Sequence, residues 1–257
     1  MLVCLLLFDK YYDKNGNWSD KPSIKDELNS SIMNPIGTQM KTRDKIIYTS
    51  LELFNEHGER NITTNHIAAH LGISPGNLYY HFRNKEDIIR SIFALYHDHL
   101  ESGFQPYEGE PISIELLINY FDAMFYAMWE FRFMYANLSD ILSRDEELKK
   151  LYLAAQKQVL TRSSQILIKL NQDGVLSIEQ DEIIPLTETM KMIVSFWIGY
   201  KQIHSIDTRI TKTSLYEGLL RLLMIAKAYS TPDSRATFVR LEQHYRRLAA
   251  SPTAQSV

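Results

Sequence analysis

The fold of this chain is decided by residues 63–82, which read TTNHIAAHLGISPGNLYYHF. Thr63 or Thr64 can cap a short helix, because a threonine hydroxyl accepts a hydrogen bond from a free amide of the first turn. Gly72 suits the left-handed turn that ends this helix, and Ser74 followed by proline opens a second one. A short helix, a glycine-containing turn and another short helix are typical of a helix-turn-helix, which indicates DNA as a partner.

The second short helix is predicted to present polar and aromatic groups to its surroundings. Leu78 and Phe82 lie one helical turn apart and would anchor the helix to the domain core. The same geometry turns Asn77, Tyr79, Tyr80 and His81 towards other faces, where they can reach nucleic acid.

A longer amphipathic helix is predicted ahead of this pair, over residues 42–57. Gly58 ends its pattern, and its apolar positions recur at helical spacing: Ile46, Ile47, Leu51 and Phe54. Its apolar face would cover the helix-turn-helix, which makes a three-helix unit.

Residues 67–88 resemble the DNA-binding domain of the TetR family of bacterial transcriptional regulators. The resemblance rests on Ile67-Ala68, Leu71-Gly72-Ile73-Ser74, Gly76-Asn77-Leu78-Tyr79-Tyr80-His81-Phe82 and Asn84-Lys85-Glu86-Asp87-Ile88. A helix-turn-helix pattern alone is a moderate signal, and the Tyr-x-His-Phe and Asn-Lys-Glu segments make this one specific.

The resemblance implies a homodimer that presents two recognition helices to successive major grooves of a palindromic double-stranded DNA operator. It further implies repression that is relieved by a small hydrophobic or aromatic effector. We assign the predicted DNA-binding surface to Thr63, Thr64, Ser74, Pro75, Gly76, Asn77, Tyr79, Tyr80, His81 and Lys85. Of these, Thr64, Tyr79, His81 and Lys85 match positions that commonly touch DNA in the family, mostly at phosphates.

The length of the chain agrees with this interpretation, and its charge bears on the DNA-binding part of it. A chain of 257 residues can bury a second, larger core beside a helix-turn-helix domain. The formal net charge of -3 gives no general basic coat, which counts mildly against nucleic-acid binding. Residues 41–90, however, contain seven Lys or Arg and six Asp or Glu, so this segment has a small positive charge. Three of the basic residues lie at the start of the first helix: Lys41, Arg43 and Lys45.

The N-terminal segment, residues 1–39, is expected to be a poorly ordered extension. Residues 9–39 are polar with scattered aromatics and have no sustained periodicity. It is either an upstream extension from an early start codon, since Met40 begins where proteins of this family typically begin, or an arm that contacts DNA or the partner subunit. The apolar run at residues 2–8 is too short to span a membrane and lacks the flanks of a secretory signal. The single cysteine, Cys4, fits a reducing cytoplasm.

We expect an all-α protein, with the helix-turn-helix domain at residues 40–100 and a larger helical ligand-binding and dimerisation domain at residues 101–250. A helix from residue 85 to about 99 would join them, and the Gly and Pro residues at 101–111 mark the boundary. The larger domain is predicted to contain helical segments at 112–142, 145–171, 179–205, 214–229 and 234–249, followed by a flexible tail at 251–257. The family resemblance suggests that residues 193–203 and 215–228 pair the two subunits.

One predicted helix is apolar nearly all round and rich in aromatic and Met side chains: Phe121, Met124, Phe125, Met128, Trp129, Phe133, Met134 and Tyr135. Such a helix is either dense core or the wall of a cavity for an apolar or aromatic molecule. For the second interpretation we assign the candidate ligand contacts to Phe125, Met128, Trp129, Phe133, Trp197 and Tyr200.

The sequence also bears on other classes of protein. An enzyme is not expected, because no nucleophile-base pair, metal cluster or cofactor loop is evident, and no cofactor is predicted. His66 and His70 have a spacing compatible with zinc but lack further ligands beside them, so no metal site is predicted. A DNA-binding protein without a small-molecule ligand, acting as an activator or through a protein partner, stays open.

Overall fold

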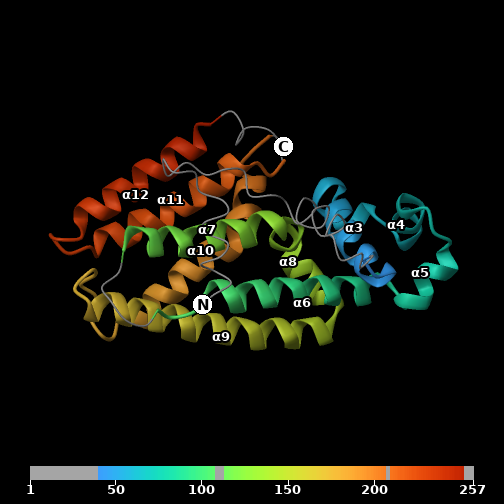
Figure 1. Cartoon of the computed structure of the whole chain (residues 1–257), viewed down its shortest axis with the longest axis horizontal. Coiled ribbons are helices and arrows are strands. Elements are labelled where there is room, and N and C mark those ends of the chain that lie inside the picture. Colours follow the sequence, from blue (N-terminus) through green and yellow to red (C-terminus); the bar gives the residue numbers. More distant parts are fainter. Residues whose placement is uncertain (1–39, 108–112, 207–208, 252–257) are drawn as a thin grey trace.

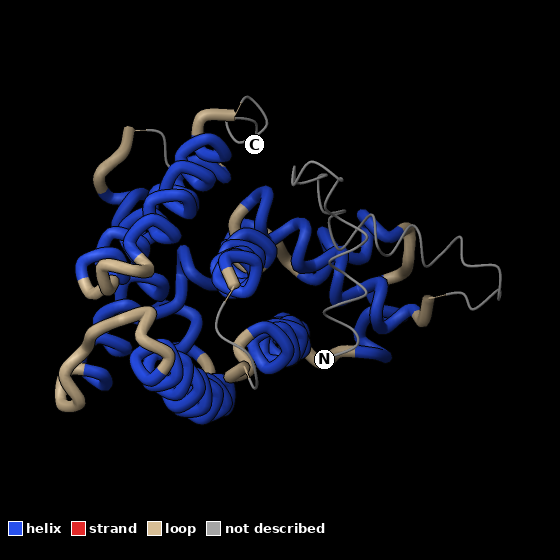
Figure 2. The backbone as a smooth tube through the Cα atoms, turned by 60° about the vertical axis from the view of Figure 1, so that its left-hand side comes forward, coloured by secondary structure: helices blue, strands red, loops and turns tan. Residues whose placement is uncertain are grey.

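The computed structural model describes residues 40–107, 113–206 and 209–251, so the predictions made for residues 1–39 and for the tail beyond Ser251 lie outside it. The described chain is all-α, as predicted, and Figure 2 shows helices joined by short loops with no strand among them. The helices are α3 Thr42–His57, α4 Thr64–Leu71, α5 Pro75–His81, α6 Lys85–Gly103, α7 Ile114–Glu130, α8 Arg132–Arg144, α9 Glu146–Gln172, α10 Ile183–Ile203, α11 Lys212–Ala228 and α12 Arg235–Ala249, with a 3₁₀ turn, η1, at Glu59–Asn61.

The first three of these helices form the small unit that the sequence predicts. The Thr63 hydroxyl caps α4 by accepting a hydrogen bond from the His66 backbone amide, while the Thr63 backbone amide donates to the His66 ring. Both of these backbone amides at the start of α4 therefore have a hydrogen-bond partner. Gly72 has a left-handed backbone with φ of 66°, and the Ser74 hydroxyl caps α5. Local capping groups therefore set the start and end of both short helices.

The remaining helices form a larger bundle around a continuous apolar core. Figure 1 places α3, α4 and α5 at one end of the molecule and the bundle at the other, with α6 running from the small unit into the bundle alongside α9. On the opposite side of the bundle, α11 and α12 pack against each other along their length. The helix α6 therefore belongs to both parts of the molecule.

The long helix predicted at 112–142 is in fact two helices. The chain turns at Phe131, where φ is -110° and ψ is 27°, so that α7 and α8 point in different directions. The side-chain amide of Asn55, from α3, satisfies the backbone at this break: its Nδ2 donates to the Glu130 carbonyl at 2.7 Å, and its Oδ1 accepts from the Phe133 amide at 3.1 Å. A residue of the small domain thus stabilises a turn of the large one.

Ion pairs at the end of α8 connect the two domains as well. Glu59, which is fully buried in η1, accepts a hydrogen bond from the Arg144 guanidinium at 2.8 Å. Arg90 on α6 donates to both oxygens of Asp145, at 3.0 and 2.9 Å. The interface is therefore held by directional contacts whose geometry would change if α6 or α8 moved.

Candidate functional site

The exposed face of α4 and α5 gathers most of the residues predicted to bind DNA. Ser74, Pro75, Gly76, Asn77, Tyr79 and Tyr80 are all exposed, and Tyr80 most of all, at 85%. The hydroxyls of Thr64 and Tyr79 lie 3.0 Å apart, which ties the two helices together on this face. Leu78 is fully buried beneath it, as its anchoring role requires. Thr63 is also exposed, and His81 is partly so.

Lys85 departs from this pattern. Its ammonium lies 2.7 Å from Oε1 of Glu59 and donates to the backbone carbonyls of Glu59 and Ile62 at 3.0 and 3.2 Å. The Lys85 side chain is only 19% exposed. The Lys85 ammonium is thus directed into the domain, which is contrary to the phosphate contact that the family resemblance implies.

Basic groups elsewhere on the small domain remain near its surface. Lys41 and Arg43, at the start of α3, are exposed, and so is Arg83 in the turn before α6. The Arg43 guanidinium lies 4.9 Å from the centre of the Phe82 ring and donates to the Ser91 hydroxyl. Arg43 and Arg83 therefore lie beside the C-terminal end of α5, a position suited to phosphate contacts.

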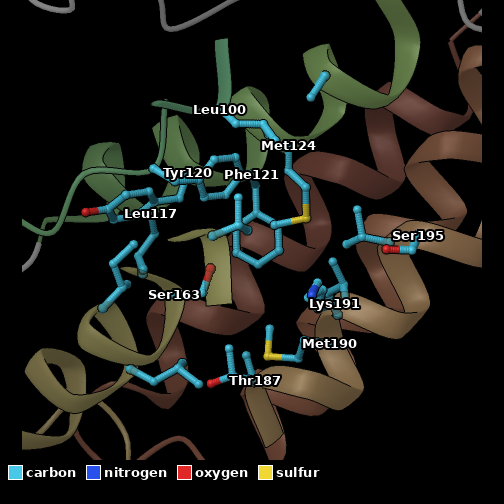
Figure 3. A pocket seen from close by; sticks show the side chains of 18 of the residues that line it. Leu100, Leu117, Tyr120, Phe121, Met124, Ser163, Thr187, Met190, Lys191 and Ser195 are labelled. Carbon is cyan, nitrogen blue, oxygen red and sulfur yellow. The ribbon is translucent and has the colours of Figure 1, made fainter. Parts of the chain in front are cut away.

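A largely apolar cavity of about 150 Å³ lies inside the larger domain. Figure 3 shows Leu100 of α6 and Leu117, Tyr120, Phe121 and Met124 of α7 on one side of it. Thr187, Met190, Lys191 and Ser195 of α10 lie on the other side, and α9, α11 and α12 complete the wall. For comparison, an apolar protein cavity of about this volume can hold benzene.

Polar groups enter the cavity at a few points only. The hydroxyls of Tyr96 and Tyr135 are 3.1 Å apart and buried, and burial raises the pKa of both phenols well above the ordinary value. Gln156 lies beside Tyr96, and Lys191 contributes an ammonium from α10. A few polar groups in an apolar enclosure are the usual composition of a small-molecule site.

None of the six predicted ligand residues lines this cavity. Phe125 stacks on Tyr216, Met128 is buried in the core, Trp129 lies under the Arg132 guanidinium, and Phe133 packs against Phe54 of the small domain. Trp197 donates to the Ser214 carbonyl, and Tyr200 is exposed and stacks on Trp197. The side of α7 that lines the cavity instead carries Leu117, Phe121 and Met124. Hydrophobic periodicity could not identify this side, because α7 is apolar on several faces.

The described part of the chain offers neither a metal site nor a membrane-spanning helix. No group of three or more His, Cys, Asp or Glu side chains there could hold a metal ion. None of the helices described is both long and apolar enough to cross a bilayer.

An exposed helix-turn-helix at one end of an all-helical chain, with a largely apolar cavity in the bundle at the other, defines a helix-turn-helix transcriptional regulator. A family model described as bacterial regulatory proteins, tetR family, matches residues 46–92, and a second, described as bacterial transcriptional repressor (TetR), matches residues 95–238. The chain belongs to the TetR family of bacterial transcriptional regulators, whose members are regulators rather than enzymes.

Individual relatives agree with this assignment. A TetR-family regulator of known structure from Marinobacter aquaeolei VT8 is 37% identical, with a TM-score of 0.73 over 80% of this chain and 99% of that one. SmeT in its complex with triclosan has the same fold at 18% identity, with a TM-score of 0.50 over 75% of this chain and 93% of that one. The regulator AcrR of Shigella flexneri is 32% identical over 85 residues, which span 31% of this chain and only 40% of AcrR.

Proposed function

We propose that this chain is a dimeric transcriptional repressor that binds a palindromic operator through α4 and α5 and is released by a small apolar effector. The observation that carries the proposal is the course of α6. Lys85 on its first turn donates to the Glu59 carbonyl of the small domain, and Arg90 pairs with Asp145 at the start of α9, while Tyr96 and Leu100 line the cavity. An effector that changes the position of α6 would therefore act on the DNA-binding face.

For the DNA complex we propose that α5 enters the major groove, with Asn77 and Tyr80 reading base edges. Asn can form a bidentate pair with adenine, and an exposed Tyr can contact either bases or phosphates. Tyr79, Thr63, Thr64, Ser74 and His81 would contact the sugar-phosphate backbone around it. In place of Lys85, we assign phosphate contacts to Lys41, Arg43 and Arg83, because these are exposed.

For the dimer we propose that α10 and α11 pair with their counterparts in a four-helix arrangement. Four large apolar side chains follow each other along α10 and are between 51% and 82% exposed: Met192, Phe196, Tyr200 and Ile203. Met224 on α11 is exposed as well, at 55%. A contiguous apolar stripe of this size is costly in water, and a second copy of the chain would cover it.

For the effector we propose occupation of the apolar cavity. Its volume, its apolar wall and its few inward polar groups support this, and so does SmeT, a protein of the same fold whose structure is a complex with triclosan. Release of DNA would follow only to the extent that the effector binds the DNA-free conformation more tightly.

The proposal is tested by fluorescence anisotropy with the full chain, titrated onto the DNA upstream of its own gene and onto a scrambled sequence at two salt concentrations. Specificity is the informative quantity, because nonspecific binding is mostly counterion release. We expect tight binding with a clear preference for the upstream DNA and two subunits per palindrome. Equal, weak binding to both sequences would contradict a role for this chain in autoregulation, and a search over genomic DNA fragments would then decide whether it has a specific site at all.

A further inference from the structure

The cavity contains one cationic side chain that the protein itself does not neutralise. Lys191 projects from α10 into the wall formed with Met190 and Ser195, and Figure 3 shows its amino group on that side of the cavity. Among the described residues, no hydrogen bond or ion pair to its ammonium is found. The wall of the cavity that Lys191 shares is mostly hydrocarbon and includes Phe121, Met124 and Met190.

Such a position is unfavourable for an isolated charge. Burial lowers the pKa of Lys191 below its ordinary value, and the field of Glu188, an exposed carboxylate one turn earlier on α10, opposes this only in part. Transfer of an ammonium from water to apolar surroundings costs free energy unless a partner compensates. A purely structural lysine would gain more from turning its head to the solvent.

We propose that the effector of this protein is a small carboxylate with an apolar body, whose carboxylate pairs with the Lys191 ammonium while its hydrocarbon part fills the cavity. This inference rests on the proposed function, because it specifies the chemical class of the effector in the same cavity. It adds a residue that decides specificity, and it names the charge that the effector carries.

The composition of the cavity favours a monoanion of modest size. A single ammonium balances one negative charge, whereas a phosphate ester near neutral pH carries up to two and would leave part of its charge in apolar surroundings. The remaining wall is aromatic and aliphatic, including Phe104, Leu167 and Phe238, and the volume of about 150 Å³ suits one aromatic ring or a short alkyl chain. Ser163 offers a hydroxyl from α9 as a further partner for a polar head.

The test compares acids with their uncharged amides. Phenylacetate, phenylpropionate, octanoate and decanoate, and the four matching primary amides, are titrated into the wild-type protein at neutral pH by calorimetry. A charge-assisted hydrogen bond corresponds to a preference for the acid of about ten- to a hundredfold. Equal or tighter binding of the amides, or no binding by any of the acids, would overturn the inference.

Two variants connect the preference to this side chain. Lys191→Met keeps the length and removes the charge, so we expect the acids to lose about ten- to a hundredfold in affinity while the amides bind as well as before or better. Lys157→Met, an exposed lysine of α9 outside the cavity, is the matched control and should leave both series unchanged. An unchanged preference for acids in Lys191→Met would also overturn the inference.

Operator release separates this inference from the proposed function. If the amides bind the protein and cause it to release the operator while the acids do not, the chain is still an effector-controlled repressor, but the inference of a carboxylate effector is refuted. A third outcome is that neither series binds the cavity and neither lowers the operator affinity of a protein that does bind its operator. The carboxylate inference then fails, and effector control by this chemical class fails with it, while DNA recognition stands.

Discussion

Replacement of Lys85 by Met is expected to destabilise the DNA-binding domain rather than to remove a DNA contact. The substitution leaves the Glu59 carboxylate, which is fully buried, with Arg144 as its remaining partner, and it leaves the carbonyls of Glu59 and Ile62 without their ammonium donor. Removal of one partner from a buried ion pair is strongly destabilising, because the other charge stays buried without compensation.

The magnitude follows from the geometry. At the 2.7 Å separation of Lys85 and Glu59, Coulomb attraction amounts to roughly 6 kcal/mol for an effective dielectric constant of about 20. Desolvation of both groups offsets part of this, and single-partner removals from buried pairs cost about 3–5 kcal/mol. Since a small domain is stable by only about 5–15 kcal/mol, the variant should retain a folded domain with a greatly reduced free energy of unfolding.

The assay is urea denaturation followed by far-ultraviolet circular dichroism, with the variants Lys85→Met, Glu59→Gln and the double variant. Because Glu59→Gln removes the stranded charge, the double variant should be less destabilised than the sum of the single ones, by roughly 1–3 kcal/mol. Lys41→Met, at an exposed lysine of the same domain, is the control and should change stability by no more than about 0.5 kcal/mol.

DNA binding at several salt concentrations supplies the result that would refute this reasoning. If Lys85 contacted a phosphate, Lys85→Met would reduce the slope of log affinity against log salt by about 0.9 and leave stability nearly unchanged. We expect the opposite: lower stability with an unchanged slope. Lys41→Met should show the reduced slope if Lys41 is one of the phosphate contacts proposed above.

Three further outcomes are expected. Phe196→Glu on the exposed stripe of α10 should convert the dimer to monomers in analytical ultracentrifugation, whereas Leu153→Glu, at a similarly exposed residue of α9, should not. Gly218→Ala should lower the urea midpoint, because the new Cβ would lie 2.7 Å from Trp197, and overpacking of about 1–3 kcal/mol exceeds the roughly 1 kcal/mol gained in helix propensity. Burial lowers the pKa of His244, so its contribution to stability is fully present above the unfolded value of about 6.5 and is lost as the pH falls through the lower folded value. As the pH is lowered from about 7, the urea midpoint of the wild type should therefore decrease, and that of His244→Gln should decrease less.

Local signals were sufficient for the DNA-binding domain. The caps at Thr63 and Ser74 and the left-handed glycine at Gly72 act within one turn of chain, so the sequence predicts α4 and α5 closely. The break between α7 and α8 was missed because its stabilising group, the Asn55 amide, is about 75 residues away in the sequence. No periodic pattern contains a contact of that kind.

The cavity could be predicted as a property of α7 but not as a set of residues. A helix with apolar side chains on every face has no face that hydrophobicity alone marks as the lining, and the predicted contacts Phe125, Met128 and Trp129 lie outside the lining of this cavity. Phe133 was placed on the same helix, but the turn at Phe131 carries it to the domain interface. Lys191 gave no signal, because a lysine one turn from Glu188 on an amphipathic helix reads as an ordinary surface pair.

The course of α6 limits how strongly an effector can control DNA binding. Lys85 and Arg90 hold its first turns through Glu59 and Asp145, so a movement of α6 that follows cavity filling must carry both ion pairs with it or break one. Breaking a buried pair costs about 3–5 kcal/mol, whereas an effector supplies only its difference in binding free energy between the two conformations, so moving the pairs intact requires less of it. The interface should therefore move as a unit with α8, and the effector should act by changing the orientation of the whole DNA-binding domain rather than by unfolding its contacts. Variants that break the Glu59 and Asp145 pairs would then uncouple the cavity from the operator while each site still binds its own ligand.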